Sequence, residues 1–211
     1  MSEYPRKYLQ AYGFLSAFGQ KVDSRPPKIH LNLTKGFVFG TLFKLMQTSA
    51  APANRAQLKE VAYASPGYLR FDVEPSIAAA VRDSIAGYMR SVSVVREVTK
   101  TLVSWSNDRK DTKEITNAQA GALVRKLGNA LVFDGEALLR SCDTAKYAAK
   151  AAVSYSRRVQ YLAQDEASGS ALLVGLDEPD EASREAVLGQ RRQRSGDEDQ
   201  MDLDGFDSDD V

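Results

Sequence analysis

The sequence has few of the residues on which redox and metal sites depend. Cys142 is the only cysteine, so no disulfide can form within the chain and no cysteine cluster can bind zinc. His30 is the only histidine, and in residues 28–34 it alternates with apolar residues, a pattern typical of a half-buried strand. We therefore expect no metal site and no cofactor.

Motifs of common enzymes are absent as well. There is no glycine-rich phosphate loop ending in Lys-Ser or Lys-Thr, no Gly-x-Ser-x-Gly turn and no His-Glu-x-x-His helix. Helix capping and surface pairing explain the acidic side chains that could form a carboxylate site, so we expect a protein that is not an enzyme. An unusual helical enzyme is the alternative, and its carboxylates would come from Asp72, Glu74, Asp134, Glu136 and Asp143.

Long hydrophobic runs are also missing. The apolar run at residues 36–46 is far shorter than the roughly 20 residues that a membrane-spanning helix needs. The N-terminus carries Glu3, Arg6 and Lys7 and has no apolar stretch ending in a cleavage site. These features predict an intracellular, cytoplasmic protein without a membrane contact, or a component of a virion.

Net charge is zero only because two unlike segments cancel. Residues 1–164 contain 24 Lys plus Arg against 13 Asp plus Glu, whereas residues 165–211 contain 4 against 15. A basic segment attracts phosphates because neutralising them releases condensed counterions, and an acidic segment on the same chain can compete for that surface. The last 16 residues hold eight acidic side chains and no basic one, which predicts a disordered acidic tail.

Hydrophobic spacing predicts a mainly α-helical protein, a helix bundle with at most one short strand, at residues 28–34. We expect an N-terminal arm at residues 1–35, a basic bundle at 36–164 and a flexible acidic tail at 165–211. Three helices are expected before residue 72: a short one that carries Tyr8, Tyr12 and Leu15, a buried one at 36–51, and a short one after Asn54. A long helix should follow, from an N-cap at Asp72 to about Trp105. The next helix starts in a capping box at Thr116 to Gln119, and after a break at 133–136 another apolar helix face runs to Leu162.

Basic residues gather in stripes on the long helices. At about 100° per residue, one arc of the last helix holds four side chains, with two more basic ones flanking it. A second stripe lies on the long helix that follows Asp72. The predicted nucleic-acid-binding residues are Lys146, Lys150, Arg157 and Tyr161 on the arc, Arg140 and Arg158 beside it, and Arg82, Arg90, Arg96 and Lys100 on the second stripe. Tyr147, Tyr155 and Tyr161 could stack on bases. The alternative is that both stripes are ordinary solvated helix faces.

Aromatic and apolar side chains near the two ends predict contacts with protein partners. Tyr8, Tyr12 and Phe14 in the arm are expected to bind a neighbouring subunit. Leu203 and Phe206 stand alone in an acidic field, which suits docking on a partner while the acids steer the approach.

The sequence resembles the coat proteins and nucleoproteins of helical RNA viruses in outline. The similarity lies in basic helices combined with terminal extensions, and in the segment at residues 68–72, which resembles the chain leading into one helix of rod-shaped plant virus coat proteins. This resemblance implies a self-assembling coat or nucleocapsid subunit that binds single-stranded RNA. The acidic tail resembles that of single-stranded DNA-binding proteins, whose β-barrel needs a repeated strand pattern that this chain lacks.

A second interpretation gives the chain no nucleic-acid ligand of its own. On it, the protein is a non-enzymatic adaptor or assembly cofactor, a class that includes single-strand-binding replication accessory proteins, and the acidic tail docks on a protein. Binding to nucleic acid distinguishes the two interpretations.

Overall fold

The computed structural model describes residues 3–20, 43, 46, 55–62, 68–106 and 115–169. The chain divides into two compact units, one formed by residues 1–61 and 69–173 and the other by residues 62–68 and 174–211. Of the second unit, only Ala62 and Tyr68 are described. The predicted strand at 28–34 lies outside the described residues. Of the flexible tail predicted at 165–211, residues 165–169 are described and 165–167 are helical, whereas the rest, with Leu203 and Phe206, lies outside the described residues.

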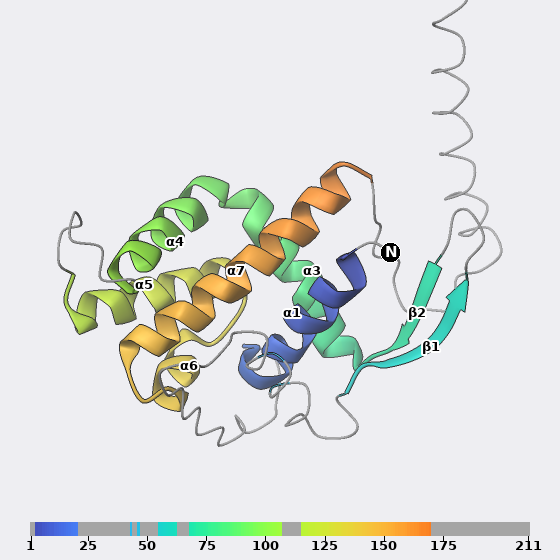
Figure 1. Cartoon of the computed structure of the whole chain (residues 1–211), viewed down its shortest axis with the longest axis horizontal. Coiled ribbons are helices and arrows are strands. Elements are labelled where there is room, and N and C mark those ends of the chain that lie inside the picture. Colours follow the sequence, from blue (N-terminus) through green and yellow to red (C-terminus); the bar gives the residue numbers. More distant parts are fainter. Residues whose placement is uncertain are drawn as a thin grey trace, which may run out of the picture. The chain divides into compact units, whose positions relative to one another are not determined.

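The described part is mainly helical, as predicted (Figure 1). Its helices are α1 (Tyr4–Phe18), α3 (Pro75–Arg90), α4 (Val92–Ser106), α5 (Asn117–Ala130), α6 (Gly135–Ser141) and α7 (Ala145–Ala167). Two strands, β1 (Gln57–Ala62) and β2 (Tyr68–Asp72), pair in a small sheet. The expectation of at most one strand is therefore wrong.

Helix α7 is the centre of the bundle and contacts α1, α3, α4, α5 and α6. Its sequence permits this because small residues let neighbouring helices approach closely. Four of its alanines are fully buried, namely Ala148, Ala149, Ala151 and Ala152.

Helix α1 confirms the first predicted helix but not the predicted arm. Tyr8, Tyr12 and Phe14 are buried, and α1 packs against α3 and α7. Phe14 stacks on Tyr155 at a ring separation of 4.1 Å, and Phe133 meets both rings edge-on. Residues 4–18 therefore belong to the bundle, because their aromatic side chains complete its core.

The segment after Asn54 corrects a predicted helix. Residues 57–62 form β1, and Leu58 is 55% exposed instead of lying on a buried helix face. The turn formers Pro66 and Gly67 and the β-forming aromatics of residues 68–72 favour pairing of two strands over a short, weakly amphipathic helix. The apolar helix predicted at 36–51 is described at only two positions, Phe43 and Met46, which are helical and fully buried.

The long helix predicted from Asp72 to Trp105 is two helices. Glu74, not Asp72, caps α3 by accepting a hydrogen bond from the Ile77 N–H at 2.9 Å, and Pro75 lies in the first turn as expected. Ser91 interrupts the helix and its N–H bonds to the carbonyls of Gly87 and Tyr88. The apolar spacing continues across this break, which is why periodicity alone does not reveal it.

The second half of the bundle follows its capping residues. Thr116 and Gln119 form the predicted capping box at the start of α5, and Asp134 caps α6 after the predicted break. The last predicted helix is also divided, because Thr144 accepts a hydrogen bond from the Tyr147 N–H and starts α7 separately from α6.

A buried hydrogen-bond chain joins three helices in the core. Tyr155 of α7 donates to the Ser84 hydroxyl of α3 at 2.7 Å, and Ser84 donates to the Leu131 carbonyl after α5 at 2.8 Å. Gly87 of α3 lies so close to the Ala130 carbonyl that a Cβ would collide with it. Together these contacts fix α3, which carries one end of the groove described below.

Candidate functional site

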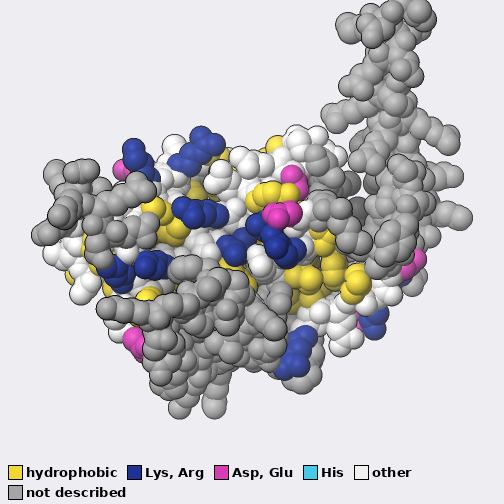
Figure 2. Space-filling model, in the orientation of Figure 1, with side chains coloured by type: hydrophobic (Ala, Val, Ile, Leu, Met, Phe, Trp, Pro, Cys, Tyr) yellow, Lys and Arg dark blue, Asp and Glu magenta, His cyan; other side chains and the backbone are white. Residues whose placement is uncertain are grey.

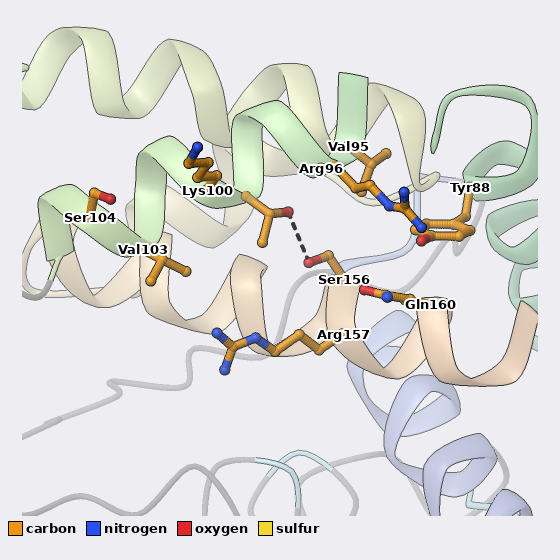
Figure 3. Close-up of a pocket in the computed structure, with 10 residues that line it drawn as sticks. Tyr88, Val95, Arg96, Lys100, Val103, Ser104, Ser156, Arg157 and Gln160 are labelled. Atoms are coloured by element: carbon orange, nitrogen blue, oxygen red, sulfur yellow. Dashed lines mark hydrogen bonds between the residues drawn. The ribbon is translucent and has the colours of Figure 1, made fainter. Parts of the chain in front are cut away.

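A groove runs between α4 and α7, which lie side by side (Figure 3). Its volume is about 300 Å³. The end of α3 closes one side through Tyr88. The described residues that line the groove are Tyr88, Val95, Arg96, Thr99, Lys100, Val103, Ser104, Ser156, Arg157 and Gln160.

Helix periodicity explains why charged side chains rim this groove. Helix α4 buries Val95, Val98 and Leu102, which leaves Arg96 and Lys100 exposed one turn apart. Helix α7 buries residues on both sides of Arg157, which itself is exposed. Two amphipathic helices that share an apolar contact thus bring their polar margins together above it.

The charge of the groove is of one sign. Arg96, Lys100 and Arg157 line it, and no carboxylate does so among the described lining residues. Within the described segments none of these three cations forms an ion pair, whereas Arg125 is paired with Glu136 at 2.6 Å. Figure 2 shows Lys and Arg side chains gathered over α4 and α7. As far as the described residues go, the groove is therefore a positive surface whose cations have no carboxylate partner.

Two hydroxyls form a hydrogen-bonded link across the floor of the groove. Ser156 donates to the Val153 carbonyl at 2.9 Å, which uses the only hydroxyl hydrogen that Ser156 has. Thr99 Oγ1 and Ser156 Oγ are 3.2 Å apart, so Thr99 is the donor in that bond (Figure 3). Both hydrogens are engaged inside the protein, and the floor offers acceptors instead of donors.

Tyr88 differs from these hydroxyls. Its side chain is 4% exposed, yet its hydroxyl has no hydrogen-bond partner, and it is the one buried side-chain polar atom in the described segments for which this is so. Figure 3 shows it at the end of the groove, beside the guanidinium of Arg96.

The structure brings together three of the ten predicted nucleic-acid-binding residues, Arg96, Lys100 and Arg157, from both predicted stripes. Lys146 and Lys150 lie on the same strip of α7 as Arg157, toward the helix N-terminus, and are half-buried. They extend the line of the groove but do not line it.

Arg158 is a correction. Its guanidinium donates to Gln10 Oε1 at 2.8 Å and to the Ser154 carbonyl at 2.6 Å, and it lies 3.8 Å from the ring centre of Phe43. Burial lowers the pKa of Arg158 to about 10, so the side chain stays charged at neutral pH. Arg158 therefore stabilises the contact between α1 and α7 and is not free to bind a ligand.

The other predicted binding residues lie outside the groove. Arg82 of α3 is exposed and lies near Tyr8. Burial raises the pKa of Tyr8 to about 12, and the positive charge of Arg82 opposes this rise. Arg90 and Arg140 are exposed in the last turns of α3 and α6. Tyr161 lies beneath the ammonium of Lys7, 5.4 Å from its ring centre.

Four aromatic side chains predicted to bind partners or bases are core residues. Tyr8 and Phe14 are buried, as is Tyr12, whose hydroxyl accepts a hydrogen bond from the Glu74 N–H at 2.8 Å. In this structure their side chains are therefore in the core and not at the surface. Tyr155 is fully buried as well, so it cannot stack on a base.

Sequence reasoning missed the polar uncharged members of the groove. Tyr88 falls at apolar spacing in the long helix predicted from Asp72 to about Trp105, and the sequence predicts no role for Thr99, Ser156 and Gln160. A tyrosine on an apolar stripe signals that its hydroxyl needs a partner, but only the structure shows that the partner is missing.

The described segments contain no group of three or more His, Cys, Asp and Glu side chains that could hold a metal ion. None of the helices described has the length and apolar content needed to cross a bilayer. A comparison with known protein families, with curated proteins and with solved structures finds no match for this chain. The groove's own chemistry is therefore the basis for assigning a function.

Proposed function

We propose that this protein binds single-stranded nucleic acid, RNA in preference to DNA, by holding the phosphate backbone in the groove between α4 and α7. The observation that carries the proposal is that Arg96, Lys100 and Arg157 line the same groove with no carboxylate among the described lining residues. Each cation that neutralises a phosphate releases counterions, which favours binding without regard to base sequence.

The polar floor of the groove supports the preference for RNA. With the hydrogens of Thr99 and Ser156 engaged, the floor can only accept a hydrogen bond: Ser156 Oγ keeps one lone pair and Thr99 Oγ1 keeps both. The ribose 2′-hydroxyl can donate such a bond, and DNA lacks it.

We further propose that the chain acts as a structural subunit of coat or nucleocapsid type and assembles with copies of itself on the nucleic acid. The sequence supplies a regulator of this activity. Residues 165–211 carry a net charge of −11, which cancels the +11 of residues 1–164, so the tail competes with phosphates for the groove or recruits a partner.

The deciding experiment is a salt titration of oligouridylate and oligodeoxythymidylate binding, followed by fluorescence anisotropy. The full chain is compared with the triple variant Arg96→Gln, Lys100→Gln and Arg157→Gln. The matched control has the same change of charge at exposed positions outside the groove, Lys59→Gln, Arg70→Gln and Lys126→Gln. Thermal melting shows that each variant is folded.

We expect tighter binding to RNA than to DNA and a loss of about two in the slope of log affinity against log salt for the groove triple, since each single-strand phosphate contact contributes roughly 0.7. Replacing the eight acidic residues after Gly196 by their amides should tighten binding. Equal losses in the groove triple and the control triple would overturn the site. No binding by any form would favour the adaptor function instead.

A further inference from the structure

We propose that the Tyr88 end of the groove is a phosphate subsite, in which the Tyr88 hydroxyl donates a hydrogen bond to a backbone phosphate oxygen that Arg96 also holds. The inference rests on the proposed function and deepens it, because it names the contact that recognises the phosphate group itself as distinct from its charge.

Other buried tyrosines show what Tyr88 lacks. The hydroxyl of Tyr155 donates to Ser84 at 2.7 Å, and that of Tyr4 donates to Glu166 Oε1 at 3.0 Å. Leaving a buried hydroxyl without a partner costs free energy that native proteins usually avoid, so an unpartnered one calls for an explanation. A bound ligand that supplies an acceptor is such an explanation.

The surroundings of Tyr88 define the missing acceptor. Arg96 lies beside its hydroxyl, Gln160 lies on α7, and no described lining residue is an acid (Figure 3). A guanidinium can only donate, so an acceptor that serves both Arg96 and Tyr88 is best anionic and has more than one oxygen. A phosphate meets both conditions.

The rest of the groove favours a phosphate that belongs to a chain. Lys100 lies one helical turn beyond Arg96 on α4, and Arg157 lies on α7 across the groove. A single free phosphate would engage the Tyr88 end and leave these cations unneutralised. A polynucleotide carries successive phosphates and can neutralise all of them.

The hydrogen bond from Tyr88 and the charge of Arg96 have separable signatures. Removing a neutral donor lowers affinity equally at every salt concentration, because no counterion release is lost. Removing a cation also reduces the dependence on salt. Tyr88→Phe should therefore shift the salt plot without changing its slope, and Arg96→Gln should change both.

The test uses the full chain with oligouridylate and, separately, with inorganic polyphosphate across a salt series. Tyr88→Phe should bind oligouridylate about tenfold more weakly at parallel slope, the size expected for a hydrogen bond to a charged acceptor. The control Tyr4→Phe removes a hydroxyl outside the groove and should bind like the parent. Thermal melting of the unliganded Tyr88→Phe protein should show no loss of stability, since the Tyr88 hydroxyl makes no hydrogen bond with any described residue.

The outcomes separate this inference from the proposed function. If the parent binds oligouridylate and Tyr88→Phe binds it equally well, the subsite is wrong and the nucleic-acid function stands. If the parent binds only polyphosphate and Tyr88→Phe weakens that, the phosphate subsite stands and the nucleic-acid ligand is wrong. A destabilised unliganded Tyr88→Phe protein would show that the hydroxyl is structural, and would overturn the inference.

Discussion

Two neighbouring arginines on opposite sides of α7 have different surroundings. Arg157 faces the groove beside α4, where it is exposed and forms no ion pair within the described segments. Arg158 faces α1, where Gln10, Ser154 and the ring of Phe43 engage it. Adjacent residues of the same type thus have unrelated tasks, because a helix turns successive side chains about 100° apart.

The comparison teaches that a basic stripe is not yet a binding site. A cation can bind a ligand only if other groups of the protein do not already engage it in hydrogen bonds, ion pairs or ring contacts. On the α1 side of α7, side chains are engaged in aromatic stacking and hydrogen bonds. On the α4 side, no described residue forms an ion pair with Arg157 or a hydrogen bond with the Tyr88 hydroxyl.

The largest expected effect breaks the α1 side. Phe14→Ala should lower the free energy of unfolding by about 4 kcal/mol, because it removes a fully buried ring that stacks on Tyr155 and leaves a cavity. Urea denaturation followed by circular dichroism measures this loss. Val103→Ala, a half-buried position in the groove, should cost about 1 kcal/mol or less. Similar losses from both variants would refute the difference between the two sides.

A middle-sized effect compares the two arginines directly. Arg158→Gln should cost about 2 kcal/mol of stability, because the carbonyl of Ser154 and the amide of Gln10 lose a charged donor. Arg157→Gln should change stability by no more than about 0.5 kcal/mol, as expected at an exposed position.

Ligand binding should give the reverse order. Oligouridylate affinity should fall for Arg157→Gln and stay near that of the parent for folded Arg158→Gln. If the folded Arg158→Gln variant bound oligouridylate more weakly than Arg157→Gln, Arg158 would be a binding residue after all.

The smallest expected effect is a pH dependence of protein stability, caused by Glu166 at the C-terminal end of α7, where α7 contacts α1. Burial raises the pKa of Glu166, although the hydrogen bond from Tyr4 opposes the shift. The folded state therefore holds the proton more tightly than the unfolded state, and stability falls as the pH rises from the ordinary carboxyl pKa through the raised value.

Glu166→Gln keeps an acceptor for Tyr4 but cannot titrate. Relative to the parent it should be more stable at neutral pH by a few tenths of a kcal/mol, since the group is partly solvated, and the difference should vanish in acid. Thermal melting across pH 4 to 8 measures it. An unchanged difference across this range would exclude Glu166 as the titrating group.

Features set by local chemistry could be predicted from the sequence. The capping box at Thr116, the break before Gly135 and the helical class follow from residues a few positions apart. The pairing of β1 with β2 and the break at Ser91 could not, because they depend on contacts and geometry beyond a local periodic pattern.

The site was predicted in part for the same reason. Periodicity assigned Arg96 and Arg157 to basic stripes, but it cannot show that the stripes face one groove. It also cannot show which groups are satisfied, so it included Arg158 and missed Tyr88.

Ser91 determines how α4 is rotated about its axis relative to α3. Helices α3 and α4 are joined at this single residue, and Tyr88 and Arg96 lie on either side of it. Deleting one residue there would rotate α4 by about 100° relative to α3 while leaving both helices intact. Tyr88 and Arg96 would then no longer line the same groove, although no charge and no helix would be lost. The site therefore depends on the number of residues between the two helices as well as on their types.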